Sequence, residues 1–367
     1  MKKPRRVRIA GRILILIMFM GEGSLASPTV PSQRSSPPAG KSMIVVDSLS
    51  RRVAIPSRVE RIISLQPEMT RILIALGVGE RLVGSEYFMR RFDPLVGITF
   101  PRERRLPLVS AGAQSVNAEM VLRLNPDVIF APPEDLSLSD SLQEKTGKPV
   151  VALSSMGRFE RLMEEIKLAG AVTGREERAA ELVSYFQAIL TRIRGEIGEG
   201  ADQSRPRVYL SLWGALNRTP VSYEPIAAAG GVNVAEGLLA TLKASVQATI
   251  NIERILKWNP DIILIHGNFR PETRLVTVEG VLSDARLASL GAVKNKKVYY
   301  TFGFANWWDP AEVLVETLQL VRLFHPNRFG GIDLEAEGNA VFKKFYGIEN
   351  GFTALSGILE CHDWVRR

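Results

Sequence analysis

Hydrophobic and polar positions follow the same pattern in the two halves of this chain. The first half contains LRLNPDVIF at Leu122–Phe130, and the second contains LKWNPDIIL at Leu256–Leu264. The apolar and basic residues before each Asn are typical of the last turn of a helix, the Pro cannot continue that helix, and the Asp is typical of the turn that follows. The apolar run after each Asp predicts a strand buried on both faces, as in a parallel sheet. The repeat therefore predicts two lobes built on one plan.

Short apolar runs bounded by turn residues predict further strands in each half. In the first half they are Arg61–Leu65, Arg81–Ser85, Val128–Ala131 and Pro149–Ser154, and in the second they are Arg207–Leu212, Ile262–His266 and Lys297–Phe302. Helical periodicity covers Met69–Leu76, Asn117–Leu124, Asn251–Trp258 and an amphipathic stretch at Ala311–Phe324. Because strands alternate with helices, the chain is predicted to form parallel α/β units.

The middle of the chain has helical periodicity without strand signals. Arg175–Ile197 predicts a helix of about six turns, and GAVTG at Gly170–Gly174 separates it from a helical stretch that begins at Arg158. A surface helix of an ordinary domain would show the same pattern. The position of this helix midway between the two Asn-Pro-Asp units favours a helix that connects the lobes.

The N-terminus has the composition of a secretory signal. A basic block precedes the apolar run Ile13–Met20, which is far shorter than the roughly 20 residues needed to span a bilayer. Small residues at Ser24 and Ala26 follow, so we expect a signal peptide cleaved after Ala26 rather than an uncleaved anchor. The only cysteine, Cys361, excludes an intramolecular disulfide, and no cysteine stands at the cleavage site to carry a lipid. These features predict a soluble periplasmic protein.

Composition and charge are those of a globular protein once the signal is set aside. Hydrophobic residues make up 46% and charged residues 23% of the 367 positions, as in a soluble two-domain protein. We expect a signal peptide at 1–26, a disordered Pro/Ser-rich leader at 27–42, an N-terminal α/β lobe at 43–157, a helical linker with the inter-lobe helix at 158–199, a C-terminal α/β lobe at 205–329 and a C-terminal helical tail at 330–367. The signal carries six basic residues and one acidic residue, so its removal lowers the formal net charge from +8 to +3. That balance predicts no nucleic-acid partner.

A family resemblance rests on four further features. They are SLQPEMTRILIALGVGERLVG (Ser64–Gly84), the two Asn-Pro-Asp units, LAGAVTGREERAAEL (Leu168–Leu182) and AAGGVNVAEG (Ala228–Gly237). Over Met43–Phe329 the chain resembles the periplasmic substrate-binding proteins of ABC importers, specifically the class III, helical-backbone family for iron–siderophore complexes, haem and cobalamin. The resemblance implies two Rossmann-like α/β lobes with parallel-type sheets, joined by a single long α-helix, with the ligand cleft between the lobes. It also implies a monomer that partners an ABC permease homodimer with its ATPase.

Two glutamates occupy equivalent positions in the repeated units. Glu119 and Glu253 each stand two residues after an Asn, Asn117 or Asn251, that is predicted to be the N-cap of a helix. An acid in a first helical turn complements the helix dipole, a structural role worth roughly 0.3–1 kcal/mol. In the family that the chain resembles, a glutamate at this position on each lobe forms salt bridges with arginines of the two membrane subunits. The resemblance therefore implies permease docking for both residues.

The chain departs from the family pattern at one position. The family usually reads P-x-x-T-E where this chain has Pro67–Arg71, so an arginine replaces the acid. The role of that acid is therefore not carried over to Arg71, and the ion pairing around it is an open question.

Candidate ligand-binding residues follow the predicted strands. In open α/β lobes, ligands bind beyond the carboxyl ends of the strands. The residues there that we expect to line the cleft are Gln66, Tyr87, Arg90, Arg91, Trp213, Arg218, His266, Arg270, Phe304, Trp307 and Trp308. The aromatic side chains suit a large planar ligand, and the arginines suit its carboxylates. Alternatively, NWWDP packs the last helix against the body, in which case at most one of its two Trp lines the cleft.

The ligand is expected to be a chelated metal rather than a bare ion. Zinc and manganese sites need several His and carboxylate ligands together, and this chain has three His, of which only His266 is a candidate. Tyr87 would suit direct ligation of ferric iron, although a solvated loop tyrosine is the simpler interpretation. We therefore predict no intrinsic cofactor and a ligand such as an iron complex, haem or a corrinoid.

Two other functions remain as alternatives. The first is a periplasmic enzyme on the same two-lobed, chelatase-like fold, but the chain has no GxSxG, GxxxxGK[ST] or HExxH motif and no cysteine cluster. The second is a metal-chelate chaperone, sensor or scavenger that passes its ligand to another protein. The prediction is a binding protein that is not an enzyme.

Overall fold

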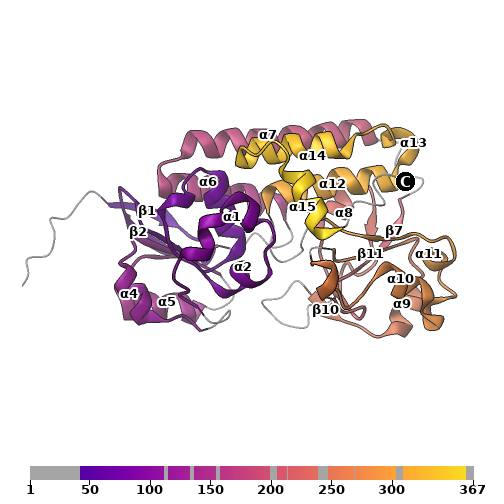
Figure 1. Ribbon diagram of the computed structural model, residues 1–367, viewed down its shortest axis with the longest axis horizontal. Helices are drawn as coiled ribbons and strands as arrows, with labels where there is room; N and C mark the ends of the chain where they lie inside the picture. Colours follow the sequence, from indigo (N-terminus) through magenta and orange to yellow (C-terminus); the bar gives the residue numbers. More distant parts are fainter. Residues whose placement is uncertain are drawn as a thin grey trace, which may run out of the picture. The chain divides into compact units, whose positions relative to one another are not determined.

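Two four-stranded parallel sheets form the centres of the two lobes (Figure 1). The computed structural model describes residues 42–110, 115–132, 136–153, 158–198, 205–212, 214–238, 247–267, 269–302 and 309–360. The first sheet has the order β4-β3-β5-β6, with strands β3 (Ile62–Ser64), β4 (Leu82–Gly84), β5 (Val128–Ala131) and β6 (Val150–Ala152). The second has the order β9-β7-β11-β12, with strands β7 (Arg207–Ser211), β9 (Val232–Asn233), β11 (Ile262–Ile265) and β12 (Val298–Tyr300). Both lobes place their second strand outside the first, so they share one topology, and the predicted fold class is confirmed.

Each sheet is covered on both faces, as the apolar runs of its strands predict. In β5 all four residues are buried, and successive side chains point to opposite sides. Phe130 packs into a large core with the long helices, whereas Ile129 packs into a smaller core with Val121 of the helix before the strand. The second lobe repeats this division: Leu264 joins the large core and Ile263 a smaller one.

Short helices connect the strands within each lobe. In the first lobe these are α1 (Pro67–Ala75), α2 (Tyr87–Phe92), α3 (Val96–Thr99), α4 (Ala118–Leu124) and α5 (Leu136–Thr146). In the second they are α8 (Glu224–Ala228), α9 (Ile252–Trp258), α10 (Val278–Ser283) and α11 (Gly291–Lys294). Two antiparallel two-stranded sheets, β1 (Ser42–Val46) with β2 (Arg52–Pro56) and β8 (Arg218–Pro220) with β10 (Gln247–Thr249), lie outside the two parallel sheets.

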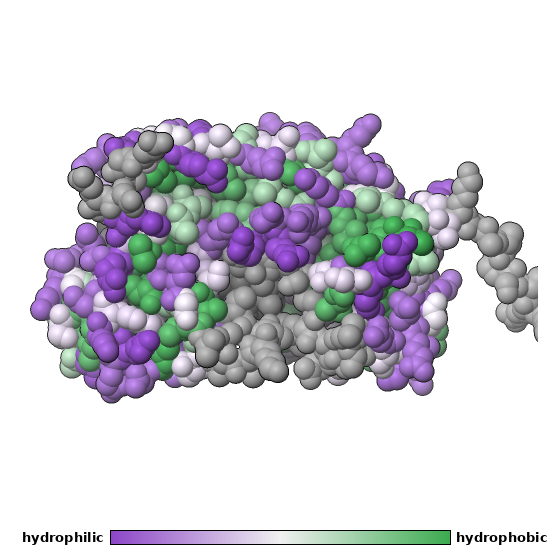
Figure 2. Space-filling model, turned by 180° about the vertical axis from the view of Figure 1, so that it is seen from behind, coloured by the Kyte–Doolittle hydropathy of each residue, from purple (hydrophilic) through white to green (hydrophobic). Residues whose placement is uncertain are grey.

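A layer of longer helices joins the lobes. The chain passes from the first lobe into α6 (Phe159–Thr173) and then into α7 (Glu176–Ile197), which is the long connecting helix expected from the sequence. The two helices meet closely at Gly170, where an added Cβ would lie 2.6 Å from the Cβ of Ala179. The outward side of α7 is polar, and Figure 2 shows hydrophilic residues interspersed with hydrophobic ones on the face seen from behind.

The last helices pack back along α7 and onto the first lobe. They are α12 (Pro310–Phe324), α13 (Pro326–Phe329), α14 (Leu334–Tyr346) and α15 (Gly351–Leu359). In Figure 1, α14 lies beside α7, and two ion pairs join them, Arg192 with Glu337 at 2.9 Å and Lys344 with Glu181 at 2.5 Å. Helix α14 also contacts α1, and α15 contacts α3. Among the described residues, no helix is long and apolar enough to cross a membrane.

Helix α12 has the polar and apolar sides of the predicted amphipathic helix, but its polar side does not face solvent. Its bounds are close to those expected, but 13 of its 15 residues are buried, including Glu312, Glu316 and Gln319. The reason is that α7, α8 and α14 all pack against it, so the side that carries polar residues also faces protein. Polar groups on this helix must therefore find partners inside the fold.

Candidate functional site

The two Asn-Pro-Asp units have nearly identical local structures. Asn117 Oδ1 accepts a hydrogen bond from the Met120 amide at 2.9 Å, and Asn251 Oδ1 accepts one from the Arg254 amide at 3.0 Å, which confirms both predicted N-caps. Helices α4 and α9 each have seven residues. Each ends at the Asn of its unit, Asn125 or Asn259, in the left-handed conformation, at φ of 44° and 42°.

The aspartates of the two units attach each turn to the first strand of its sheet. Asp127 Oδ2 accepts from the amide of Arg61 at 2.9 Å, and Asp261 Oδ2 accepts from the amide of Arg207 at 2.8 Å. The same two arginines return the contact, because their guanidinium groups donate to carbonyl oxygens in the last turns of α4 and α9. The repeated Asn-Pro-Asp motif therefore has a structural role: it fixes one short helix, α4 or α9, against each sheet.

Glu119 and Glu253 lie at equivalent points on these two fixed helices. Each is the second residue of its helix and is exposed, and Figure 1 shows α4 and α9 in different lobes. Neither carboxylate has an ion-pair partner among the residues that the structure describes. The described part of the chain therefore assigns the two acids no electrostatic task except stabilising the N-termini of their helices.

Helix α2 brings three predicted cleft residues together: Tyr87, Arg90 and Arg91. Arg90 is largely occupied inside the lobe, because it donates to the carbonyl oxygens of Glu103 at 2.9 Å and Leu106 at 2.6 Å. The guanidinium of Arg91 is exposed instead and lies 5.7 Å from the centre of the Phe92 ring. Of the two arginines on α2, Arg91 is thus the more accessible to a ligand.

Two aromatic residues of the same helix are absent from the candidates chosen from the sequence. The ring of Tyr87 lies 5.7 Å from that of Phe88 and 6.0 Å from that of Phe92, and the latter two rings are 6.1 Å apart. Phe92 is 41% exposed. The sequence YFMRRF could have indicated them. In one short helix its first, second and sixth residues lie on one side, opposite the third and fourth, Met89 and Arg90, which anchor the helix.

The N-cap of α2 is a buried acid. Glu86 accepts hydrogen bonds from the amides of Phe88, at 2.6 Å, and Met89. Burial raises the pKa of Glu86 to about 7, although the two amide bonds act in the opposite direction. The carboxyl group therefore titrates near neutral pH.

Arg71, the residue that departs from the family pattern, lies at the centre of a buried ion-pair network. Its Nε is 2.8 Å from Asp93 Oδ2, and its Nη1 is 3.6 Å from Glu312 Oε2 on α12. Burial raises the pKa of Glu312 well above its ordinary value, while the positive charge of Arg71 opposes that shift. Asp309, the N-cap of α12, accepts a hydrogen bond from the hydroxyl of Tyr346 on α14. Arg71 thus connects α1, the end of α2 and α12.

The remaining described candidates are spread over both lobes. Gln66 is buried as the N-cap of α1, and its carbonyl oxygen accepts from Ser64 Oγ at 3.0 Å. His266 follows β11 and is 2% exposed, and burial lowers its pKa to about 3, so its imidazole is neutral. Arg218 on β8 and Arg270 after β11 are exposed. Trp213, Phe304, Trp307 and Trp308 lie outside the described residues.

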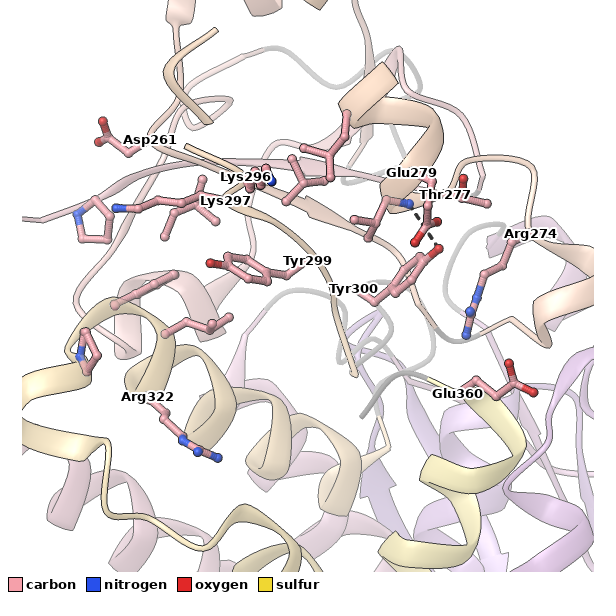
Figure 3. Close-up of a pocket in the computed structure, with 18 of the residues that line it drawn as sticks. Asp261, Arg274, Thr277, Glu279, Lys296, Lys297, Tyr299, Tyr300, Arg322 and Glu360 are labelled. Atoms are coloured by element: carbon pink, nitrogen blue, oxygen red, sulfur yellow. Dashed lines mark hydrogen bonds between the residues drawn. The ribbon is translucent and has the colours of Figure 1, made fainter. Parts of the chain in front are cut away.

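The second lobe contains a hollow of about 1300 Å³ along the outer edge of β12. Figure 3 shows Lys296, Lys297 and Arg322 on one side of it and Arg274 and Glu360 on the other. Between them lies Tyr300, whose hydroxyl oxygen accepts from the Val278 amide at 3.2 Å. None of the predicted ligand residues that the structure describes lines this hollow. Within the described chain, no group of three or more His, Cys, Asp or Glu residues is placed to hold a metal ion.

Comparisons with known proteins agree on one family. The sequence profile described as "Periplasmic binding protein" matches residues 62–302. Molybdate-binding protein MolA of Haemophilus influenzae is 27% identical over 333 residues, with 83% of this chain and 90% of the relative covered. A cobalamin-binding protein of Halobacterium salinarum is 25% identical over 256 residues, with 68% of this chain and 66% of the relative covered. The solved structure of MolA bound to molybdate superposes with a TM-score of 0.72 at 24% identity, covering 83% of this chain and 98% of that one.

Proposed function

The chain belongs to the periplasmic binding protein family, and we propose that it is the substrate-binding component of an ABC importer, which captures a chelated metal in the periplasm and delivers it to a membrane permease. The family and the relatives named above are binding proteins rather than enzymes. The observation that carries the proposal is the pair of exposed glutamates on two identically built helices, one in each lobe of the same topology.

Docking through Glu119 and Glu253 follows from their equivalence. A permease made of two identical subunits presents the same cationic site twice, so a monomer that binds it needs two matched acidic sites. The N-cap bonds of Asn117 and Asn251 and the left-handed Asn at the other end fix the orientation of both helices. A cationic partner on each membrane subunit would complete an electrostatic contact that the described residues leave open.

The chemistry of the described candidates favours a ligand whose metal is held by a chelator. His266 is buried and neutral, and the half-buried Tyr87 and the exposed Arg91 and Arg270, which follow the carboxyl ends of strands, suit an organic anion better than a naked cation. The relatives bind molybdate and cobalamin, both metal compounds. Gln66, Arg90, Arg218, Trp213, Phe304, Trp307 and Trp308 remain proposed contacts of the same ligand.

Charge reversal tests the docking role. We expect Glu119→Arg and Glu253→Arg each to abolish binding of the ligand-loaded protein to membranes that contain its permease, while ligand affinity stays unchanged. Glu279→Arg is a matched control, because Glu279 is also the exposed second residue of a helix with a side-chain N-cap, α10. Loss of ligand binding in the first two variants, or equal loss of docking in the control, would contradict the proposal.

A further inference from the structure

The outer edge of β12 has backbone groups that lack hydrogen-bond partners. Strand β12 is the last strand of the second sheet, and the carbonyl oxygen of Lys297 accepts from the amide of Ile263 on β11 at 3.0 Å. Because backbone groups alternate in direction along a strand, those of Val298 and Tyr300 point outward, away from β11. The carbonyl oxygen of Tyr300 accepts from Gln319 Nε2 at 3.4 Å. Among the described residues, the Tyr300 amide and both backbone groups of Val298 have no partner, although Val298 is only 3% exposed. Buried backbone groups are rarely left in this state.

The first lobe contains an equivalent edge. Strand β6 is the last strand of the first sheet and pairs with β5 as β12 pairs with β11. The repeated Asn-Pro-Asp motif aligns β5 with β11, so the register of the two strand pairs makes Val150 the equivalent of Val298. In the same register Ala152 is the equivalent of Tyr300. The two edges therefore present the same backbone groups in the same arrangement.

In the first lobe, the turn between β1 and β2 covers this edge. The amide of Ser48 donates to the carbonyl oxygen of Ala152 at 3.0 Å, and the amide of Ala152 donates to Asp47 Oδ2 at 3.2 Å. The guanidinium of Arg51 donates to the carbonyl oxygen of Val150 at 2.9 Å. The counterparts of the Ala152 amide and the Val150 carbonyl are among the groups without partners in the second lobe.

The hollow of about 1300 Å³ lies along this open edge rather than over one face of the sheet (Figure 3). Tyr299 and Leu323 in its wall pack against the large core, on the side of α12. Leu282 and Val298 in its wall belong to the smaller core, on the side of α10. Because both faces of the sheet contribute to the wall, the hollow continues the sheet in its own plane. An added strand would lie there, about 4.8 Å from β12.

The charges around the hollow favour an acidic occupant. Its lining includes five basic residues, Arg205, Arg274, Lys296, Lys297 and Arg322, and three acidic ones, Asp261, Glu279 and Glu360. In Figure 3, Lys296, Lys297 and Arg322 lie on one side, and none of them has an ion-pair partner among the described residues. Asp261, near them, accepts from a backbone amide of β7. A second copy of this chain, paired edge to edge, would bring like charges together, whereas a segment with carboxylates would neutralise them.

We propose that the open edge of β12 binds an extended, acidic segment of another polypeptide as an added strand of the second sheet. The segment donates to the carbonyl oxygen of Val298 and accepts from the amide of Tyr300, the two groups whose counterparts are bonded in the first lobe. Main-chain hydrogen bonds supply the affinity in this mode of recognition, and flanking side chains supply the specificity. The edge is separate from Glu119 and Glu253 and from the described ligand candidates, so the inference goes beyond the proposed function and does not depend on it.

Hydrogen exchange followed by NMR on the full chain tests whether the edge is open. We expect the amide of Tyr300 to exchange much faster than the amide of Ala152, because only the latter has a hydrogen-bond acceptor. Equal protection of the two amides would overturn the proposal. In that case another part of this chain, such as the residues after Glu360, would already occupy the edge.

The binding probe is an acetylated and amidated peptide with the sequence of Ile44–Ser50. It copies the segment that covers the edge of the first lobe, with Asp47 and Ser48 but without Arg51. One control peptide has Lys in place of the Asp, and the other has N-methyl groups on alternate amides. We expect the probe, at millimolar concentration, to slow the exchange of the Tyr300 amide. The N-methylated peptide should bind about tenfold more weakly or less, because it loses main-chain hydrogen bonds. The Lys peptide should also bind more weakly, because its charge is repelled.

Charge reversal in the protein tests the basic side of the hollow. Lys296→Glu combined with Lys297→Glu should weaken binding of the probe about tenfold, because acids replace the cations beside its carboxylate. Lys294→Glu is the matched control, since Lys294 is exposed on the neighbouring α11 but does not line the hollow. Equal weakening by the control, equal binding of the probe and either control peptide, or no binding of the probe by the folded protein would each overturn the proposal and leave the proposed function intact.

Discussion

Replacing Arg71 with methionine is expected to destabilise the fold strongly, because it removes the cation from a buried network. The side chains of Arg71, Asp93 and Glu312 are 1%, 0% and 1% exposed. Removing one partner of a buried pair typically costs about 3–5 kcal/mol. Asp93 keeps hydrogen bonds from the amides of Leu95, at 2.8 Å, and Val96, at 3.3 Å, which compensate part of its lost contact. We therefore expect a loss near the lower end, about 3 kcal/mol.

The loss should also depend on pH. Burial raises the pKa of Glu312 above its value in an unfolded chain, so its contribution to stability falls as pH rises through the folded pKa. Without Arg71, the positive charge that opposes this rise in the pKa of Glu312 is lost. The decline in stability therefore extends to higher pH in the variant than in the parent protein. The variant should consequently lose more stability at pH 8 than at pH 5.5, and the double variant Arg71→Met, Glu312→Gln should recover part of the loss at pH 8.

Urea unfolding followed by tryptophan fluorescence and far-UV circular dichroism measures these differences. Arg58→Met is the matched control: Arg58 is 2.9 Å from Glu60, but the two side chains are 82% and 47% exposed. An exposed pair of this kind contributes at most about 1 kcal/mol. If Arg71→Met lowers the free energy of unfolding at pH 8 by no more than Arg58→Met does, the buried ion pairs of Arg71 do not stabilise the packing of α1 and α2 against α12.

Three further predictions concern single residues. Burial lowers the pKa of His266 to about 3, so as pH falls this histidine is protonated in the unfolded chain before it is protonated in the folded one. The free energy of unfolding should therefore drop by about 2 kcal/mol between pH 6.5 and 5. In thermal unfolding, His266→Asn should show a smaller dependence of stability on pH over this range. Burial raises the pKa of Glu86 to about 7, so its contribution to the free energy of unfolding should be lost as pH rises from 4.5 through 7. In urea unfolding, Glu86→Gln should lose less stability than the parent protein over that pH range, and an equal loss would contradict this assignment. Gly170→Ala should lower the melting temperature, with a cost of about 1–3 kcal/mol, because the new Cβ would lie 2.6 Å from the Cβ of Ala179; an unchanged melting temperature would show that the helices can separate.

The architecture of each lobe could be predicted because its signals are local. The two Asn-Pro-Asp units specify a helix end, a turn and a strand within nine residues, and the two N-caps are readable from the Asn before each acid. The all-round burial of α12 was not predictable in this way. Its sequence has polar positions on one side, and only the packing of α7, α8 and α14 decides that this side faces protein.

The candidate site was predictable only where neighbours in sequence are also neighbours in space. Tyr87 and Arg91 share α2, and the same six residues contain Phe88 and Phe92, which short-range helical geometry could have added. The partners of Arg71 could not be found, because Asp93 stands at the end of another helix, α2, and Glu312 belongs to a helix in the last fifth of the chain. Arg90 likewise could not be separated from Arg91 without knowing the path of the loop that carries Glu103 and Leu106.

The packing of the final helices onto the first lobe governs when that lobe can finish folding. Helix α14 contacts α1, and α15 contacts α3, although more than 250 residues separate the two helices of each pair. During synthesis from the N-terminus, the strands of the first sheet are made long before α14 and α15. The contacts of these two helices with α1 and α3 therefore carry the entropy cost of closing a very long loop. The chain should therefore remain incompletely folded until its last residues are available, and its exposed apolar surface needs protection from aggregation during that delay.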